Sequence, residues 1–125
     1  MNFFDAHTRL PELARRLETH EGLVVACYCA AWCDTCNAYR PGFEALAGRL
    51  PQHLFVWVDI EECEALLDDI DVENFPTILV QSPQGNLFFG PLLPHLEHLE
   101  RLLQGLDASC PADHPGPGPL KDLID

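Results

Sequence analysis

Basic residues are scarce in this chain of 125 amino acids, which carries 7 Lys and Arg against 20 Asp and Glu. The formal net charge of −13 at pH 7 repels both the phosphates of nucleic acid and anionic lipid surfaces. We therefore expect neither nucleic acid nor a membrane as a partner. The acidic excess is typical of a solvated surface, and we interpret it as a source of solubility.

Long hydrophobic runs are also missing. A membrane-spanning helix needs about 18 to 20 consecutive apolar residues, and no stretch of this sequence approaches that length. Residues 1–5 lack the basic and apolar regions of a secretory signal. We therefore expect a cytoplasmic location, where the 6 cysteines are more often redox or metal residues than structural disulfides.

The composition predicts one folded domain followed by a tail. An apolar content of 47% is typical of a globular protein with a single core, which we place in residues 1–106. From residue 107 onward the chain is rich in proline, small and polar residues. Such a segment buries little apolar surface, so residues 107–125 are predicted to form a flexible Pro-rich tail.

Hydrophobic periodicity predicts alternating helices and strands. Helices are expected at 9–20, 33–50, 62–69 and 93–106, and strands at 23–29, 54–60, 77–80 and 87–89. The β-α-β stretch predicts a parallel strand pair with a right-handed crossover, and the last two strands form a hairpin around residues 82–86. We therefore predict an α/β fold, with a central mixed sheet of about four strands flanked by helices on both faces.

A Cys-x-x-Cys motif, Cys33 to Cys36, lies where the apolar run 23–29 gives way to a predicted helix. Two thiols at this spacing can close a small disulfide ring. The first thiol also lies at a helix N-terminus, where the dipole and the unpaired N–H groups stabilise a thiolate. Because the thiolate is the species that attacks disulfides, the motif predicts thiol–disulfide exchange.

The element order, together with Trp32 before the first cysteine, resembles the thioredoxin family over roughly residues 9–106. Further matching features are a proline inside the second helix, a Phe-Pro pair before a strand, a glycine in the hairpin turn and a glycine lining the substrate groove. In this chain they are Pro41, Phe75 with Pro76, Gly85 and Gly90. The resemblance implies a thioredoxin-like fold.

The resemblance also implies roles for the matching residues. Cys33 would be the exposed nucleophile, and Cys36 would be the buried thiol that resolves the mixed disulfide. Pro76 would form a cis bond that directs backbone groups of Phe75 at a substrate, and Trp32 would supply apolar contact. The implied activity is a protein-disulfide oxidoreductase that acts without a bound cofactor or metal ion. It would act on disulfide-containing proteins, depend on an upstream disulfide reductase and work as a monomer.

The sequence departs from the family at two positions. Cys27 stands where members commonly carry a buried acid, and Trp57 stands where a lysine often lies near that acid. A buried acid without its partner would be costly, so the joint loss of both charges is self-consistent. The usual proton acceptor for the resolving thiol is therefore missing, and water or another thiol would have to replace it.

Cys27 and Cys29 are two residues apart on a predicted strand, so they point to one face. As accessory thiols they could join Cys33 and Cys36 in a redox relay or a metal site. Alternatively, they are small buried apolar residues, a common use of free cysteine and the reading we expect. A second function class also stays open, namely a binding or chaperone-like module whose cysteine pair is regulatory or vestigial.

Overall fold

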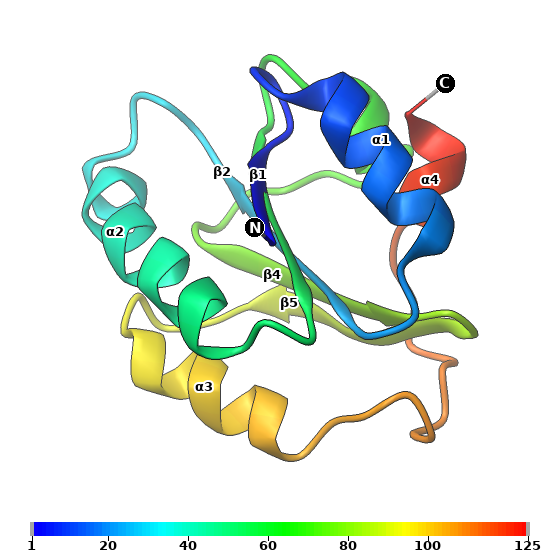
Figure 1. The fold of residues 1–125 in the computed structure, drawn as a ribbon. Helices are drawn as coiled ribbons and strands as arrows, with labels where there is room; N and C mark the ends of the chain where they lie inside the picture. Colours follow the sequence, from blue (N-terminus) through cyan, green and yellow to red (C-terminus); the bar gives the residue numbers. More distant parts are fainter. Residues whose placement is uncertain (1, 125) are drawn as a thin grey trace.

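The structure is a computed structural model that describes residues 2–124, and one mixed β-sheet lies at its centre (Figure 1). Within those residues the sheet has five strands in the spatial order β1-β3-β2-β4-β5. They span Phe3–Asp5 (β1), Val24–Cys29 (β2), Leu54–Asp59 (β3), Thr77–Ser82 (β4) and Gly85–Pro91 (β5). β3 is parallel to β1 and β2, whereas β4 is antiparallel to β2 and β5. The predicted α/β class and mixed sheet are confirmed, with β1 as an additional edge strand.

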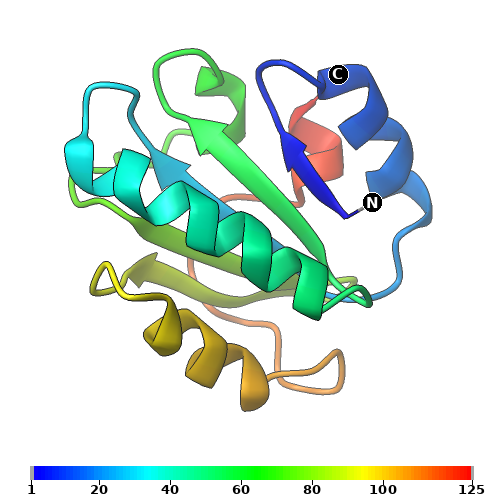
Figure 2. The same cartoon turned by 60° about the vertical axis from the view of Figure 1, so that its left-hand side comes forward.

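Helices cover both faces of the sheet. They span Leu10–Thr19 (α1), Asp34–Arg49 (α2), Leu96–Gln104 (α3) and Leu120–Leu123 (α4), with a 3-10 turn at Glu64–Leu67 (η1). α2 and α3 pack together on one face, and α1 and α4 pack together on the other (Figures 1 and 2). Between residues 2 and 124, no helix has both the length and the apolar character needed to cross a membrane.

Alternate residues of β2 divide between two apolar clusters, one on each face of the sheet. Val25, Cys27 and Cys29 join the cluster that includes residues of α2 and α3. Ala26 and Tyr28 join the cluster on the α1 side. This alternation follows from the two-residue period of a strand, and it places both strand cysteines beneath α2.

A glycine lets α2 and α3 approach closely. A Cβ atom added at Gly42 would lie 2.7 Å from Cδ2 of Leu96, the first residue of α3. Glycine inside a helix costs roughly 0.5–1 kcal/mol relative to alanine, so this position exchanges helix propensity for interhelical contact. Pro41 precedes Gly42 and lies inside α2, as the sequence predicted.

The segment after α3 runs back along the sheet toward α1 (Figure 1, orange to red). The side-chain amide of Gln81 donates a hydrogen bond to the Gly118 carbonyl at 2.9 Å. Leu120 is 1% exposed and joins the cluster on the α1 side. One anchoring leucine in a proline-rich segment carries no periodic signal, and the flexible character of residues 107–125 stays a prediction. The domain boundary at residue 106 stays a prediction.

Candidate functional site

The cysteine motif lies at the junction between the central strand β2 and helix α2. Cys33 is the N-cap residue of α2, with an extended backbone at φ −90° and ψ 113°. Its N–H donates to the Ala30 carbonyl at 3.1 Å, and its own carbonyl accepts from the Asn37 N–H at 3.1 Å. These bonds hold the half-buried Cys33 at the positive end of the helix. The neighbouring Trp32 is 67% exposed.

Cys36, in the first turn of α2, is fully buried and is bonded to Cys29 at the end of β2. The Cα atoms of this disulfide are 5.8 Å apart, and Cys33 carries a free thiol. The sequence predicted an exchange pair of Cys33 and Cys36. The structure instead joins Cys36 to the strand cysteine named as an accessory thiol. The Cys33–Cys36 exchange pair stays a prediction.

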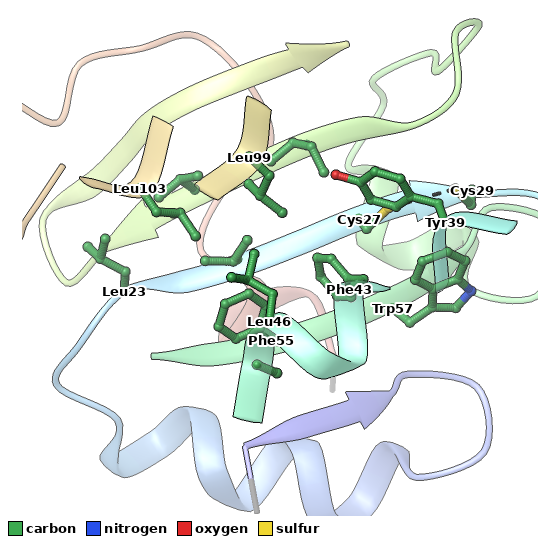
Figure 3. Close-up of a cluster of buried hydrophobic side chains, with 14 of the residues drawn as sticks. Leu23, Cys27, Cys29, Tyr39, Phe43, Leu46, Phe55, Trp57, Leu99 and Leu103 are labelled. Atoms are coloured by element: carbon green, nitrogen blue, oxygen red, sulfur yellow. Dashed lines mark hydrogen bonds between the residues drawn. The ribbon is translucent and has the colours of Figure 1, made fainter. Parts of the chain in front are cut away.

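Cys27 lies beside this disulfide. Its Sγ is 3.7 Å from Sγ of Cys29, and the residue is fully buried (Figure 3). Burial raises the pKa of the Cys27 thiol, because the thiolate would lose its hydration. Cys27 pairs with Trp57 in the β2–β3 register, so the thiol and the indole occupy the two positions where the resemblance would place an acid and a lysine.

Tyr39 completes the buried surroundings of the cysteines, and it was not identified from the sequence. It is 2% exposed, and within the described residues its hydroxyl has no hydrogen-bond partner. Burial, and then the neighbouring Cys27 thiol, raise the pKa of Tyr39. Figure 3 shows Cys27, Cys29, Tyr39 and Trp57 gathered at one end of the apolar cluster. The helical spacing of three residues from Cys36 is the signal that could have located Tyr39.

Aromatic rings flank the exposed side of the motif. The rings of Trp32 and Phe75 make an edge-to-face contact, with centroids 5.5 Å apart. The peptide bond from Phe75 to Pro76 is cis, and Pro76 is buried. The structure therefore brings together residues that the sequence assigned to a substrate groove. Gly90 lies on β5, opposite Ile78 of β4. A Cβ atom added at Gly90 would contact only the Phe88 ring, at 3.6 Å, so packing does not require glycine at this position.

The remaining cysteines, Cys63 and Cys110, are both free thiols. Cys63 precedes η1 and is half-buried, and desolvation raises its pKa to about 11. Cys110 lies in the segment after α3 and is also half-buried. In the described part of the chain, no three His, Cys, Asp or Glu side chains are grouped so that they could hold a metal ion.

Solved structures define the fold class. A thioredoxin from Nicotiana alata matches with a TM-score of 0.68 at 19% identity, covering 82% of this chain and 90% of that chain. A thioredoxin from Fasciola hepatica matches with a TM-score of 0.65 at 23% identity, covering 83% and 97%. The fold is therefore the thioredoxin fold.

Sequence comparison then gives the family. The family model described as Thioredoxin matches residues 7–88, more than half of the chain. Thioredoxin domain-containing protein 2 of Rattus norvegicus is 34% identical over 79 residues, which cover 62% of this chain and 14% of that protein. Thioredoxin H1 of Arabidopsis thaliana is 32% identical over 68 residues, which cover 54% and 60%. The chain belongs to the thioredoxin family, and its match spans less than two thirds of either relative.

Proposed function

We propose that this chain is a thiol–disulfide oxidoreductase that reduces protein disulfides through Cys33 and Cys36. The observation that carries the proposal is the position of Cys33. It is a free, half-buried thiol at the N-cap of α2, three residues before a buried cysteine on the same helix. A family match and a bonded cysteine pair at this junction support thiol–disulfide chemistry.

The reaction needs Cys36 as a free thiol, so it begins with Cys36 released from Cys29. The Cys33 thiolate attacks one sulfur of the substrate disulfide, and the other substrate sulfur leaves as a thiolate. Cys36 then attacks Sγ of Cys33, which releases the first substrate sulfur and closes the Cys33–Cys36 disulfide. The helix N-terminus stabilises negative charge on Cys33 as it leaves or attacks. Two electrons pass from the dithiol to the substrate.

The surroundings of Cys33 favour an extended protein segment as substrate. The exposed indole of Trp32 and the half-buried ring of Phe75 offer an apolar surface beside the nucleophile. The net charge of −13 disfavours strongly acidic partners. Turnover requires an upstream disulfide reductase, and we propose a reducing compartment such as the cytoplasm as the setting.

Trapping tests the proposal. In Cys36→Ser, a mixed disulfide formed on Cys33 has no resolving thiol, so covalent complexes with a model disulfide protein should accumulate. The matched control is Cys33→Ser with Cys36→Ser, which should form no such complex when Cys63 and Cys110 are changed to Ser in both proteins. Non-reducing gels and mass spectrometry read both outcomes. Equal adduct formation in the two variants would contradict the role of Cys33.

A binding or chaperone-like module is the second candidate, and one observation favours it. The bond between Cys29 and Cys36 removes the resolving thiol from the exchange pair. A chain fixed in that state would hold partners through the Trp32 surface without turnover. Recovery of only noncovalent partners by Cys36→Ser would support this reading over the enzyme.

A further inference from the structure

Cys36 has two possible partners within reach. Cys33 lies three residues earlier at the start of the same helix, and Cys29 lies on the adjoining strand. The Cα atoms of Cys29 and Cys36 are 5.8 Å apart, inside the usual range for a disulfide, and their sulfurs are bonded. Because a sulfur holds one disulfide partner at a time, the Cys29–Cys36 and Cys33–Cys36 disulfides exclude each other.

We propose that Cys29 is a third exchange thiol. Once Cys33 and Cys36 have formed a disulfide, Cys29 displaces Cys33 and forms a disulfide with Cys36. The disulfide then moves from the protein surface into the core beneath α2. This proposal rests on the proposed function, because the Cys33–Cys36 disulfide left by substrate reduction is its starting point.

The step balances without an outside oxidant. Sγ of Cys29 attacks Sγ of Cys36, the Cys36–Cys33 bond breaks and the Cys29–Cys36 bond forms. Cys33 leaves as a thiolate, and the proton lost by Cys29 is available to it. One disulfide is present before and after the exchange, so no net oxidation occurs. The leaving sulfur lies at the helix N-terminus, which speeds its departure. The bonded pair in the structure is the product of this exchange, Cys29–Cys36.

The position of Cys29 on β2 suits it to this role better than that of Cys27. Cys29 is the last residue of the strand, next to the turn that leads into α2, whereas Cys27 lies two residues deeper. The two sulfurs are 3.7 Å apart, so the Cys27 thiol can donate its S–H to Cys29. Cys27 itself remains protonated, because burial raises its pKa.

The exchange changes what the oxidised protein can do. Cys33 becomes a free, half-buried thiol again, while Cys36 is held in the core. A mixed disulfide formed on Cys33 in this state cannot be resolved by Cys36. Oxidation therefore converts a two-thiol catalyst into a single-thiol form that retains a partner covalently, until reduction of Cys29–Cys36 returns the resolving thiol.

The test locates the disulfide in the oxidised chain of 125 residues. Cys63 and Cys110, the other two free cysteines outside the motif and strand β2, are changed to Ser so that they take no label. The protein is oxidised with one equivalent of diamide, a thiol oxidant, and alkylated without denaturation. Chymotrypsin cuts after Tyr28, Trp32 and Tyr39, so Cys29 and the pair Cys33 and Cys36 fall on separate peptides, and fragment-ion spectra place the label or the link within the second peptide.

The proposal predicts one label per chain on Cys33 and a linked peptide pair that contains Cys29 and Cys36. An oxidised chain with Cys33 linked to Cys36 and no label would overturn it. The variant Cys29→Ala should move the disulfide to Cys33–Cys36 and abolish the Cys33 label. A Cys33 label that persists undiminished in oxidised Cys29→Ala would also overturn the proposal.

These outcomes distinguish the exchange by Cys29, here called the relay, from the proposed oxidoreductase function. The relay fails if mapping finds the Cys33–Cys36 disulfide while Cys36→Ser still traps substrates, and the oxidoreductase then stands. If Cys36→Ser traps nothing, the oxidoreductase fails whatever the mapping shows. The first mapping experiment keeps Cys27, Cys29, Cys33 and Cys36 unchanged. It therefore still tests the relay if the Cys29→Ala variant does not fold.

Discussion

Two buried tyrosines differ in how their hydroxyl groups are satisfied, and this difference predicts opposite effects of the same substitution. The Tyr28 hydroxyl donates to the Leu66 carbonyl at 2.9 Å, whereas the Tyr39 hydroxyl has no hydrogen-bond partner among the described residues. A buried unpaired polar group costs about 1–3 kcal/mol. Tyr39→Phe should therefore raise the free energy of unfolding by about 1 kcal/mol.

The matched control is Tyr28→Phe, which removes a satisfied hydrogen bond and should lower the free energy of unfolding by about 1 kcal/mol. Urea denaturation of both variants under reducing conditions measures the two changes. Destabilisation of Tyr39→Phe equal to that of Tyr28→Phe would mean that Tyr39 is hydrogen-bonded in solution.

At the level of single residues, the sequence predicted the exposed part of the site better than the buried part. Cys33, Trp32 and Phe75 belong to short local motifs, so their proximity follows from the family pattern. The bond between Cys29 and Cys36 depends on how α2 lies across β2, which no local pattern specifies. The sequence identified Cys29 as an accessory thiol but favoured simple packing.

At the level of elements, two glycines of α2 have opposite expected effects. An added Cβ at Gly48 would meet no atom within 4 Å, so Gly48→Ala should stabilise the helix by roughly 0.5–1 kcal/mol. At Gly42 the added atom would lie 2.7 Å from Leu96 Cδ2 and 2.9 Å from its Cγ. Gly42→Ala should therefore be destabilising, by about 1–3 kcal/mol, because the Leu96 side chain must shift out of its packed position.

Thermal or urea unfolding of the two glycine variants checks this difference, since both substitutions are chemically identical and lie on one helix. Stabilisation of Gly42→Ala to the same extent as Gly48→Ala would show that α2 and α3 are not packed as described.

The long amphipathic elements were predictable because their apolar periods are clear over ten or more residues. β1 was not, because Phe3–Asp5 is too short to show a period and becomes a strand only by pairing with β3. The element near residue 64 was predicted as a helix over 62–69 and is a four-residue 3-10 turn, Glu64–Leu67. It is followed by Asp68 and Asp69 at positive φ, which end the turn.

For the whole molecule, the packing of the C-terminal segment depends on Leu120. This side chain is 1% exposed in the cluster on the α1 side, so Leu120→Ala should cost about 2–5 kcal/mol of unfolding free energy. The control Leu93→Ala alters a side chain that is 64% exposed and should change stability by less than about 0.5 kcal/mol. Equal, small effects of both changes would instead support the flexible tail predicted from composition.

Buried thiol and tyrosine hydroxyl groups should make the protein less stable at alkaline pH. Burial raises the pKa values of Cys27, Tyr28 and Tyr39, and raises that of Cys63 to about 11. In the unfolded chain these groups lose protons near pH 8.5 for Cys and 10 for Tyr. Above those values the unfolded state binds fewer protons than the folded state, so the free energy of unfolding falls as pH rises.

Urea denaturation between pH 7 and pH 11, with reductant present, should show stability falling above about pH 8.5, with each group contributing up to about 1.4 kcal/mol per pH unit. Cys27→Ala should make the fall shallower between about pH 8.5 and 10. Constant stability up to pH 11 would contradict the burial of these groups.

The proposed chemistry requires that Cys36 be an exchange thiol in a reversible dithiol–disulfide pair. An equilibrium titration of the 125-residue chain against a thiol redox buffer tests this role. Tryptophan fluorescence reports the transition, because Trp32 adjoins Cys33 and Trp57 pairs with Cys27. We predict one reversible two-electron transition, between about −270 and −120 mV, that disappears in Cys36→Ser. No reversible transition, or one that survives in Cys36→Ser, would contradict the account.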